Sequence, residues 1–187
     1  MNQFNQFQEA LALIHIEKNV FLVKPDKRYF VGNTPHGGYL QALMHKALVT
    51  ILPHATAISS SVQFLDRIEN DDLTLTVDIY KISRGSSSGV VRAIQDNKVC
   101  AVFTGTCSDF EHMKGYSGLN TPLPKIFDES NMANYVEMNY DKISKGFTPN
   151  FIKQLKCLVH PDHAWWNKEE HEEDAEARCS AFLELDG

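Results

Sequence analysis

One stretch decides the fold of this 187-residue chain: His36-Gly37-Gly38-Tyr39-Leu40-Gln41-Ala42-Leu43-Met44-His45-Lys46-Ala47-Leu48. Two glycines begin an almost wholly apolar segment of about four turns, which predicts a helix in the core. Because such a helix is apolar almost all round, other elements must wrap it. The glycines let backbone N–H groups approach a ligand at the positive end of the helix. This end is therefore a candidate site for a carbonyl oxygen or an oxyanion.

The residues around this helix predict strands. We expect a short helix at residues 3–12 and strands within residues 13–24, 59–65, 73–80, 89–95 and 99–106. Residues 73–80 alternate apolar and polar side chains, which is typical of a half-buried strand. Asp96-Asn97 predicts a two-residue turn between the last two strands. An antiparallel sheet curled around one buried helix, an α+β fold, satisfies this order.

The C-terminal part of the chain differs in composition. Residues 110–150 are polar and broken by Gly and Pro, which predicts a linker with one short helix around Met132–Met138. Two strand-like runs follow, at Phe151–Val159 and Ala177–Leu185. Two strands cannot form an independent domain. We therefore expect one main domain at residues 1–109 and only the beginning of a second unit at residues 151–187.

The composition argues against several classes of function. A net charge of -6 and a pI near 5.7 argue against nucleic acid as the main partner. The sequence has no run of 18 apolar residues, so it predicts no membrane span. The N-terminus lacks the basic and apolar regions of a secretion signal. The four cysteines are scattered without a C-x-x-C pair. This pattern favours reduced thiols and a cytoplasmic protein.

The glycine-led helix followed by a long-stranded meander resembles the hotdog fold of acyl-CoA thioesterases. Within that group, the chain is most similar to the double-hotdog, acyl-CoA thioesterase II-like proteins of the thioesterase-like superfamily. The resemblance covers essentially the whole chain and is carried by Val31-Gly32, Pro35 to Tyr39, Ser61 to Leu65, Arg84-Gly85, the Gln95-Asp96-Asn97 turn and Ala177–Gly187. The family implies a duplicated hotdog of well over 187 residues. The second hotdog would be incomplete here, with its first two strands and no helix.

The resemblance implies hydrolysis of acyl-CoA to a free acid and CoA, with no metal and no redox cofactor. Such a reaction needs a polarised carbonyl and an activated water. Single-hotdog thioesterases carry a carboxylate nine residues after the His of the His-Gly-Gly motif, and here that position is His45. Double-hotdog enzymes take the carboxylate from the second copy, assisted by a hydroxyl residue and a Gln. The matching positions here are Ser61 and Gln95.

The candidate residues of the substrate site lie at the start of the helix. We expect the substrate to be bound by His36, Gly37, Gly38 and Tyr39. The acyl chain would lie along the helix beside Tyr39 and Leu43. The alternative is that the glycines only allow close packing and that His36 only caps or packs.

The three candidate catalytic residues also have structural alternatives. His45 has an ordinary pKa that suits a base near neutral pH. It also shares a helical face with Gln41, four residues earlier, and could be a buried structural histidine. Ser61 and Gln95 could be ordinary polar groups of strands.

Other motifs carry less information. His160-Pro161-Asp162-His163 with His171 has a proline and a loop-like composition that do not favour a zinc site. Ser86-Ser87-Ser88-Gly89 lacks the Lys and the following helix of a phosphate-binding loop. No G-x-S-x-G motif supports an α/β-hydrolase.

Two functions remain open at this stage. The first is an acyl-CoA thioesterase with acyl-CoA as its small-molecule partner. The alternative is a truncated or degenerate hotdog that binds acyl-CoA, or pairs with another hotdog subunit, without catalysis. In both cases the exposed sheet edge predicts a homo-oligomer.

Overall fold

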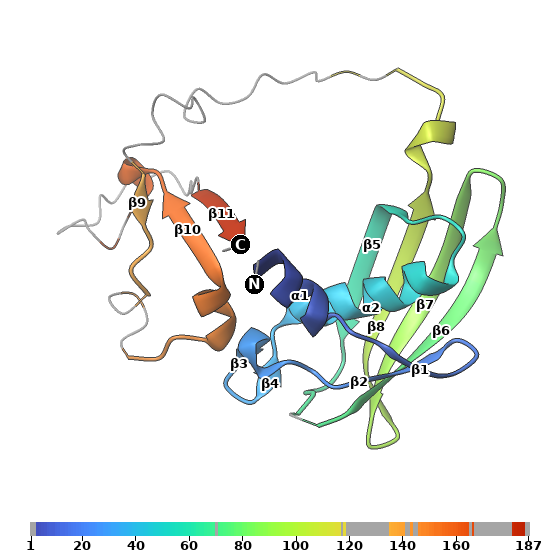
Figure 1. Cartoon of the computed structure of the whole chain (residues 1–187), viewed down its shortest axis with the longest axis horizontal. Coiled ribbons are helices and arrows are strands. Elements are labelled where there is room, and N and C mark those ends of the chain that lie inside the picture. The colour runs from blue at the N-terminus through green and yellow to red at the C-terminus, as the bar shows by residue number, and fades with distance from the viewer. Residues whose placement is uncertain are drawn as a thin grey trace.

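The computed structural model describes residues 3–69, 71–116, 118, 135–140, 143, 146–164, 166 and 181–185. Figure 1 shows a large curved sheet that holds one long helix, and a smaller sheet on the other side of the N-terminal helix. The first part of the chain contains α1 (Gln3–Ala10), β1 (Ile14–Glu17), β2 (Val20–Val23), η1 (Lys27–Tyr29), β3 (Phe30–Val31), β4 (Thr34–Pro35) and α2 (Gly37–Ile51). The remainder contains β5 (Thr56–Phe64), β6 (Leu73–Ile82), β7 (Ser86–Gln95), β8 (Lys98–Ser108), η2 (Phe110–His112), β9 (Val136–Glu137), η5 (Asn150–Gln154), β10 (Leu155–Val159), η6 (Pro161–His163) and β11 (Ala181–Leu185).

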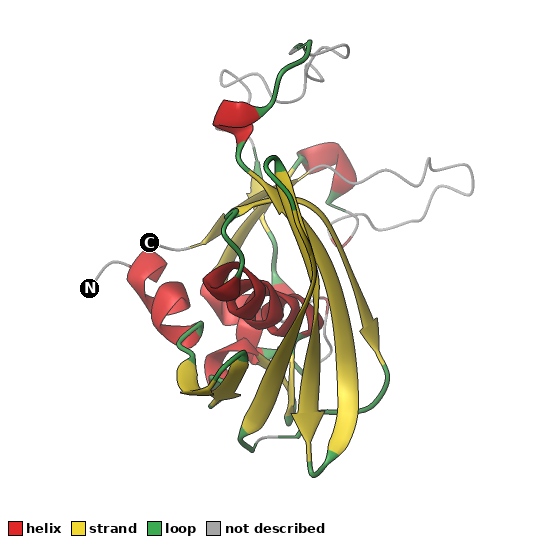
Figure 2. Ribbon diagram, turned by 90° about the vertical axis from the view of Figure 1, so that its right-hand side faces the viewer, coloured by secondary structure: helices red, strands yellow, loops and turns green. Residues whose placement is uncertain are grey.

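The large sheet wraps α2, as the sequence pattern predicts. Its strand order is β1-β2-β6-β7-β8-β5, and every neighbouring pair is antiparallel. Figure 2 shows α2 lying in the concave side of this sheet. The predicted arrangement of one buried helix inside a curled antiparallel sheet is confirmed.

The core lies between α2 and the sheet. Leu43, Met44, Ala47 and Leu48 of α2 have no exposed surface. Each fully buried Leu or Met contributes about 1.5–3 kcal/mol through the hydrophobic effect. α2 has 15 residues, and no helix in the described part of the chain has the length and apolarity to cross a membrane.

Two glycines let the sheet approach this helix closely. A Cβ at Gly105 of β8 would lie 2.6 Å from Cδ2 of Leu48, and one at Gly89 of β7 would lie 2.8 Å from Cδ1 of Leu48. Real Cβ atoms do not approach other atoms so closely, so both positions need a residue without a side chain. The helix is therefore seated on the backbones of β7 and β8.

The turn between β7 and β8 has the predicted form. Asp96 and Asn97 have φ angles of 52° and 61°. Positive φ at both central residues is typical of a type I′ turn, whose twist matches that of the flanking strands.

The smaller sheet has the order β11-β10-β9 and is antiparallel. The short helix expected around Met132–Met138 is not found in the described residues of that range, because Val136–Glu137 forms β9 and pairs with β10. The strand expected from Phe151 begins instead at Leu155, after the 3₁₀ turn η5. The segment forms β9 instead of a helix because it pairs with β10. Local sequence alone does not encode this pairing.

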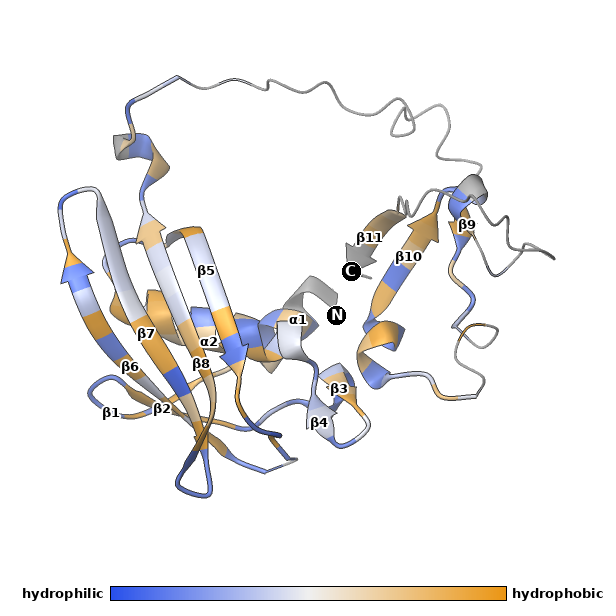
Figure 3. Cartoon of the chain, turned by 180° about the vertical axis from the view of Figure 1, so that it is seen from behind, coloured by the Kyte–Doolittle hydropathy of each residue, from blue (hydrophilic) through white to orange (hydrophobic). Residues whose placement is uncertain are grey.

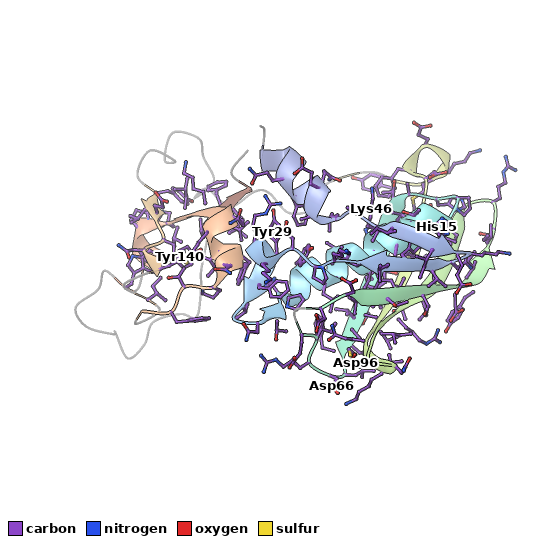
Figure 4. All side chains as sticks on the ribbon, turned by 60° about the horizontal axis from the view of Figure 1, so that its bottom comes forward. His15, Tyr29, Lys46, Asp66, Asp96 and Tyr140 are labelled. Carbon is purple, nitrogen blue, oxygen red and sulfur yellow. The ribbon has the colours of Figure 1, made fainter. Side chains whose placement is uncertain are left out.

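The two parts of the chain touch through η5. Asn150 Nδ2 donates a hydrogen bond to the carbonyl oxygen of Lys27 at 3.2 Å. The Phe151 ring stacks on the His36 ring with 3.9 Å between centroids. Figure 4 shows Tyr29 at this junction and Tyr140 farther out on the C-terminal side. The N-terminal end of α2 is thus the place where the C-terminal segment meets the large sheet domain.

Candidate active site

One face of α2 is only partly buried. Gly38, Gln41, Ala42 and His45 have the i, i+3, i+4, i+7 spacing of a single helical face. They line a hollow together with Ala57 and Ser60 of β5 and Phe103 of β8. We call this space of about 280 Å³ the polar hollow. It lies beside β5, which is an edge strand of the sheet.

Two side chains in the polar hollow already form a pair. Gln41 Nε2 donates a hydrogen bond to Ser60 Oγ at 3.3 Å. This contact leaves the Ser60 hydroxyl proton and the Gln41 carbonyl oxygen available to another group. A donor and an acceptor held side by side can orient a water molecule or a polar ligand.

His45 lies one turn farther along the same face. Its Nε2 atom is buried and has no hydrogen-bond partner among the described residues. The ring meets the Phe103 ring edge-on, with 6.1 Å between centroids. Burial lowers the pKa of His45 below its ordinary value of 6.5. The imidazole is therefore neutral near pH 7 and can accept a proton.

His36 occupies the N-terminal end of α2. Its Nδ1 accepts a hydrogen bond from the backbone N–H of Gly38 at 3.2 Å, so its side chain caps the helix. Burial lowers the pKa of His36, which keeps Nδ1 free to accept. A carbonyl oxygen that takes the Gly38 N–H must first displace this ring, which the stacked Phe151 supports.

Ser61 lies on the other face of β5 from the polar hollow. Its neighbour Val62 packs toward the core, and the Phe64 ring lies over Gly37 of α2. Because side chains alternate along a strand, Ser60 shares their face and Ser61 does not. Ser61 is exposed and pairs with Thr104 on the outer side of the sheet. Figure 3 views the molecule from behind, with this outer side of the sheet in front. Weakly polar residues, drawn in pale colours, cover the upper part of β5.

Gln95 is also remote from the polar hollow. Its Oε1 accepts a hydrogen bond from the backbone N–H of Glu69 at 2.8 Å, and only 7% of its surface is exposed. Its Nε2 lies 3.4 Å from the carbonyl oxygen of Glu69. These contacts tie the end of β7 to the loop before β6, and the catalytic role expected of Gln95 stays a prediction.

Tyr39 belongs to the core. Its hydroxyl donates to the carbonyl oxygen of Ala10 at 2.7 Å and accepts from the backbone N–H of Asp26 at 2.9 Å. Burial raises the pKa of Tyr39 to about 12. With Leu43 fully buried beside it, this face of α2 is packed against other parts of the protein. The expected path of an acyl chain beside Tyr39 and Leu43 stays a prediction, and both side chains are buried among their neighbours in this structure.

Two polar residues of the polar hollow, Gln41 and Ser60, were not among the candidates predicted from the sequence. Gly38 and His45 were expected there, and Ser60 was missed in favour of Ser61. Ser59, Ser60 and Ser61 are consecutive and equally polar, so these three residues alone do not show which side chain faces inward. The apolar residues that follow, Val62 and Phe64, could have indicated the face.

The weaker motifs have no site geometry. Ser86 to Gly89 form part of β7 and not a loop. The rings of His160 and His163 lie 5.3 Å apart between centroids, while His171 is outside the described residues. In the part of the chain that the structure describes, no group of three or more His, Cys, Asp or Glu side chains is arranged to hold a metal ion.

Comparison with known proteins shows what part of the chain is similar to. Residues 25–108, which contain α2 and the four long strands, match the family model of the acyl-CoA thioesterase N-terminal domain. No curated protein sequence matches the chain.

Three solved structures share the fold. A candidate thioesterase II from Thermobifida fusca has 17% identity and a TM-score of 0.68, with 84% of this chain and 55% of that chain covered. A hotdog-fold protein of unknown function from Alicyclobacillus acidocaldarius has 15% identity and a TM-score of 0.69, with coverages of 83% and 55%. An acyl-CoA thioesterase II from Mycobacterium marinum has 13% identity and a TM-score of 0.59, with coverages of 84% and 51%. The predicted hotdog fold is confirmed, and this chain spans about half the length of these structures.

Proposed function

Because residues 25–108 form a thioesterase-like hotdog domain, we propose that this protein hydrolyses acyl-CoA thioesters to a free acid and CoA. The observation that carries the proposal is the polar hollow itself. It places the Gln41–Ser60 pair and the unpartnered Nε2 of His45 on the face of α2 that begins at Gly38. Hydrolysis of a thioester needs no metal and no cofactor, and acyl-CoA is the only small-molecule partner that the proposal requires.

The proposed reaction gives each polar group of the hollow a role. The substrate carbonyl oxygen replaces His36 at the Gly38 N–H, where the helix dipole stabilises the developing negative charge. Gln41 and Ser60 hold a water molecule, and His45 takes a proton from it as the water oxygen bonds to the carbonyl carbon. When the C–S bond breaks, the sulfur leaves and takes the proton from His45. The products are the acid and the CoA thiol.

A second candidate function has one observation in its favour. The polar hollow is lined by no Asp or Glu among the described residues, although the related enzymes are expected to use a carboxylate. A protein of this kind could bind acyl-CoA without hydrolysing it. Binding measured without release of CoA would separate this function from the first.

The compartment belongs to the proposal as well. Cys100, Cys107 and Cys157 are buried and form no disulfide among the described residues. Free cysteines are typical of proteins in the reducing cytoplasm, where acyl-CoA is also found. We therefore place the proposed activity in the cytoplasm.

The decisive experiment compares two neighbouring serines. Ser60→Ala removes the hydroxyl that faces the polar hollow, and Ser61→Ala removes its neighbour on the outer face. With CoA release followed by a thiol reagent, we expect Ser60→Ala to lower kcat/KM about tenfold, the effect of one lost hydrogen bond of ~1.5 kcal/mol. Ser61→Ala is expected to keep the wild-type value.

The controls make the outcome clear. Circular dichroism and thermal melting of both variants show whether each is folded, and both serines are exposed enough to be replaced without loss of the core. A folded wild-type protein that releases no CoA from any acyl-CoA would refute the hydrolase. Equal losses in the two variants would refute the site.

A further inference from the structure

A second hollow lies at the same end of α2. Its lining residues come from the β3–β4 hairpin, from α2, and from β5 and the loop after it: Thr34, Pro35, Gly37, Leu40, Phe64, Asp66 and Ile68. We call this space, also of about 280 Å³, the apolar hollow. None of the proposed catalytic side chains lines it.

The interior of the apolar hollow is hydrophobic. Leu40 and Ile68 are almost fully buried, with 3% and 2% of their surfaces exposed, and they provide closed apolar walls. Phe64 provides a third wall, although 54% of its own surface is exposed. Burying an apolar group against these three side chains is favourable.

Asp66, the charged side chain that lines the hollow, is paired. It forms an ion pair with Lys98, next to the β7–β8 turn where Figure 4 labels Asp96. Arg67 does not line the hollow, and its Nε donates a hydrogen bond to the uncharged Thr34 Oγ1 at 2.9 Å. An uncharged, apolar occupant therefore fits this space better than an anion or a cation.

The two hollows flank the same helix terminus. Gly37 lines the apolar hollow and Gly38 lines the polar hollow. These residues are consecutive, so a carbonyl group at the end of α2 has polar groups on one side and an apolar space on the other. This is the arrangement that an acyl thioester requires, with a reactive carbonyl attached to a hydrocarbon chain.

We propose that the apolar hollow binds the acyl group of the substrate and that Phe64 limits its length. The inference rests on the proposed thioester hydrolysis. With a volume of about 280 Å³, the apolar hollow lies at the small end of the range of ligand pockets, which is about 300–1,000 Å³. The preferred substrates are therefore short, uncharged acyl groups of about four to eight carbons, and longer chains meet the walls.

Phe64 is the wall that can be changed with the least damage. Its ring lies over Gly37, where an added Cβ would come within 2.9 Å of Cζ. Because about half of the ring is in solvent, truncation opens the hollow outward and leaves the buried core intact. Leu40 and Ile68 are less useful for a test because they are part of that core.

The test varies this wall in both directions. Phe64→Ala should move the preferred acyl length upward by about two to four carbons and lower kcat/KM for butyryl-CoA several-fold, because the short chain loses a contact surface. Phe64→Trp should move the preference toward shorter chains. The control is Leu65→Ala, the next residue, which is also exposed and does not line the hollow. Its length profile should equal that of the wild type.

Two readouts separate this inference from the proposed function. CoA release is measured for acyl-CoA substrates from acetyl to palmitoyl, and calorimetric binding is measured for thioether analogues of the same lengths, which cannot be hydrolysed. Binding whose length profile moves with Phe64, without turnover, would support the acyl site and refute the hydrolase. A length profile that is the same in wild type and in both Phe64 variants, in folded proteins, would overturn the inference. Absence of binding at every length would overturn it as well.

Discussion

At the scale of single residues, His45 is the group that most separates this site from a carboxylate-based thioesterase. A carboxylate would be ionised and would attract a cation, whereas His45 is neutral when its pKa is lowered by burial. Its Nε2 is buried and has no partner in the described structure, so a ligand or a water molecule reaches it only when the neighbouring side chains move. A neutral imidazole in a half-buried position is suited to accept one proton and return it.

The pH dependence of the reaction follows from this pKa. Since the pKa of His45 lies below 6.5, we expect kcat/KM to stay constant from about pH 8 to about pH 6.5 and to fall only in more acid solution. His45→Gln should lower kcat/KM about hundredfold and abolish this acid limb. His15→Gln, an exposed position on β1 outside the site, should keep the wild-type profile. An unchanged acid limb in His45→Gln would mean that another group is the base.

The same shift affects stability. The folded protein binds a proton at His45 less readily than the unfolded chain, because its folded pKa is lower. Its contribution to the free energy of unfolding is therefore present above the unfolded pKa of about 6.5 and is lost as the pH falls through the folded value. His36, whose pKa is also lowered by burial, acts in the same direction.

At the scale of elements, the contact between α2 and the sheet depends on glycine. Gly105 and Gly89 allow the side chain of Leu48 to lie directly on β8 and β7. This close approach also fixes which face of α2 remains outside the core, since rotation of the helix would drive Leu48 into the sheet. The polar hollow therefore owes its position to residues that do not line it.

Alanine substitutions test this contact. Gly105→Ala places a Cβ 2.6 Å from Cδ2 of Leu48 and 2.9 Å from the Phe103 ring, and we expect it to lower the free energy of unfolding by about 1–3 kcal/mol. Gly85→Ala meets no atom within 4 Å and should change stability by less than about 1 kcal/mol, if anything upward. Urea denaturation of the two variants gives both values. Similar losses at the two positions would contradict the close-contact argument.

At the scale of the whole molecule, the large sheet has two open edges, at β1 and β5. Both edges carry exposed apolar side chains, among them Ile16 on β1 and Ile58 on β5. Unpaired strand edges with such side chains favour pairing with another chain. The polar hollow lies against the β5 edge, where a second copy would close it.

Sedimentation tests the predicted assembly. For a chain of 21.2 kDa, analytical ultracentrifugation should give a homo-oligomer, with a dimer as the smallest stable species. Ile58→Lys should shift the population toward monomer because an edge charge opposes strand pairing. Ile16→Lys on the opposite edge tests whether β1 forms the contact instead. A wild-type protein that sediments as a stable monomer would contradict this prediction.

Much of the fold could be predicted from local sequence. Helix α2 and the long strands appear as apolar patterns with periods of 3.6 and 2, and Asp96-Asn97 marks its turn without help from distant residues. These features follow from short-range geometry. The β9 strand and the η5 turn did not follow, because they depend on pairing and packing with segments far away in the chain.

The candidate site also has a part that local sequence predicts and a part that it does not. The sequence by itself determined the glycine-led end of α2 and the common face of Gln41 and His45, because helical spacing fixes both. Only the tertiary structure decided that Ser60, and not Ser61, enters the polar hollow, and which groups Gln95 and Tyr39 contact. The reason is that a polar side chain takes its role from its partner. Here the partners of Ser60 and Tyr39, Gln41 and Ala10, are 19 and 29 residues away, so only the folded chain brings them together.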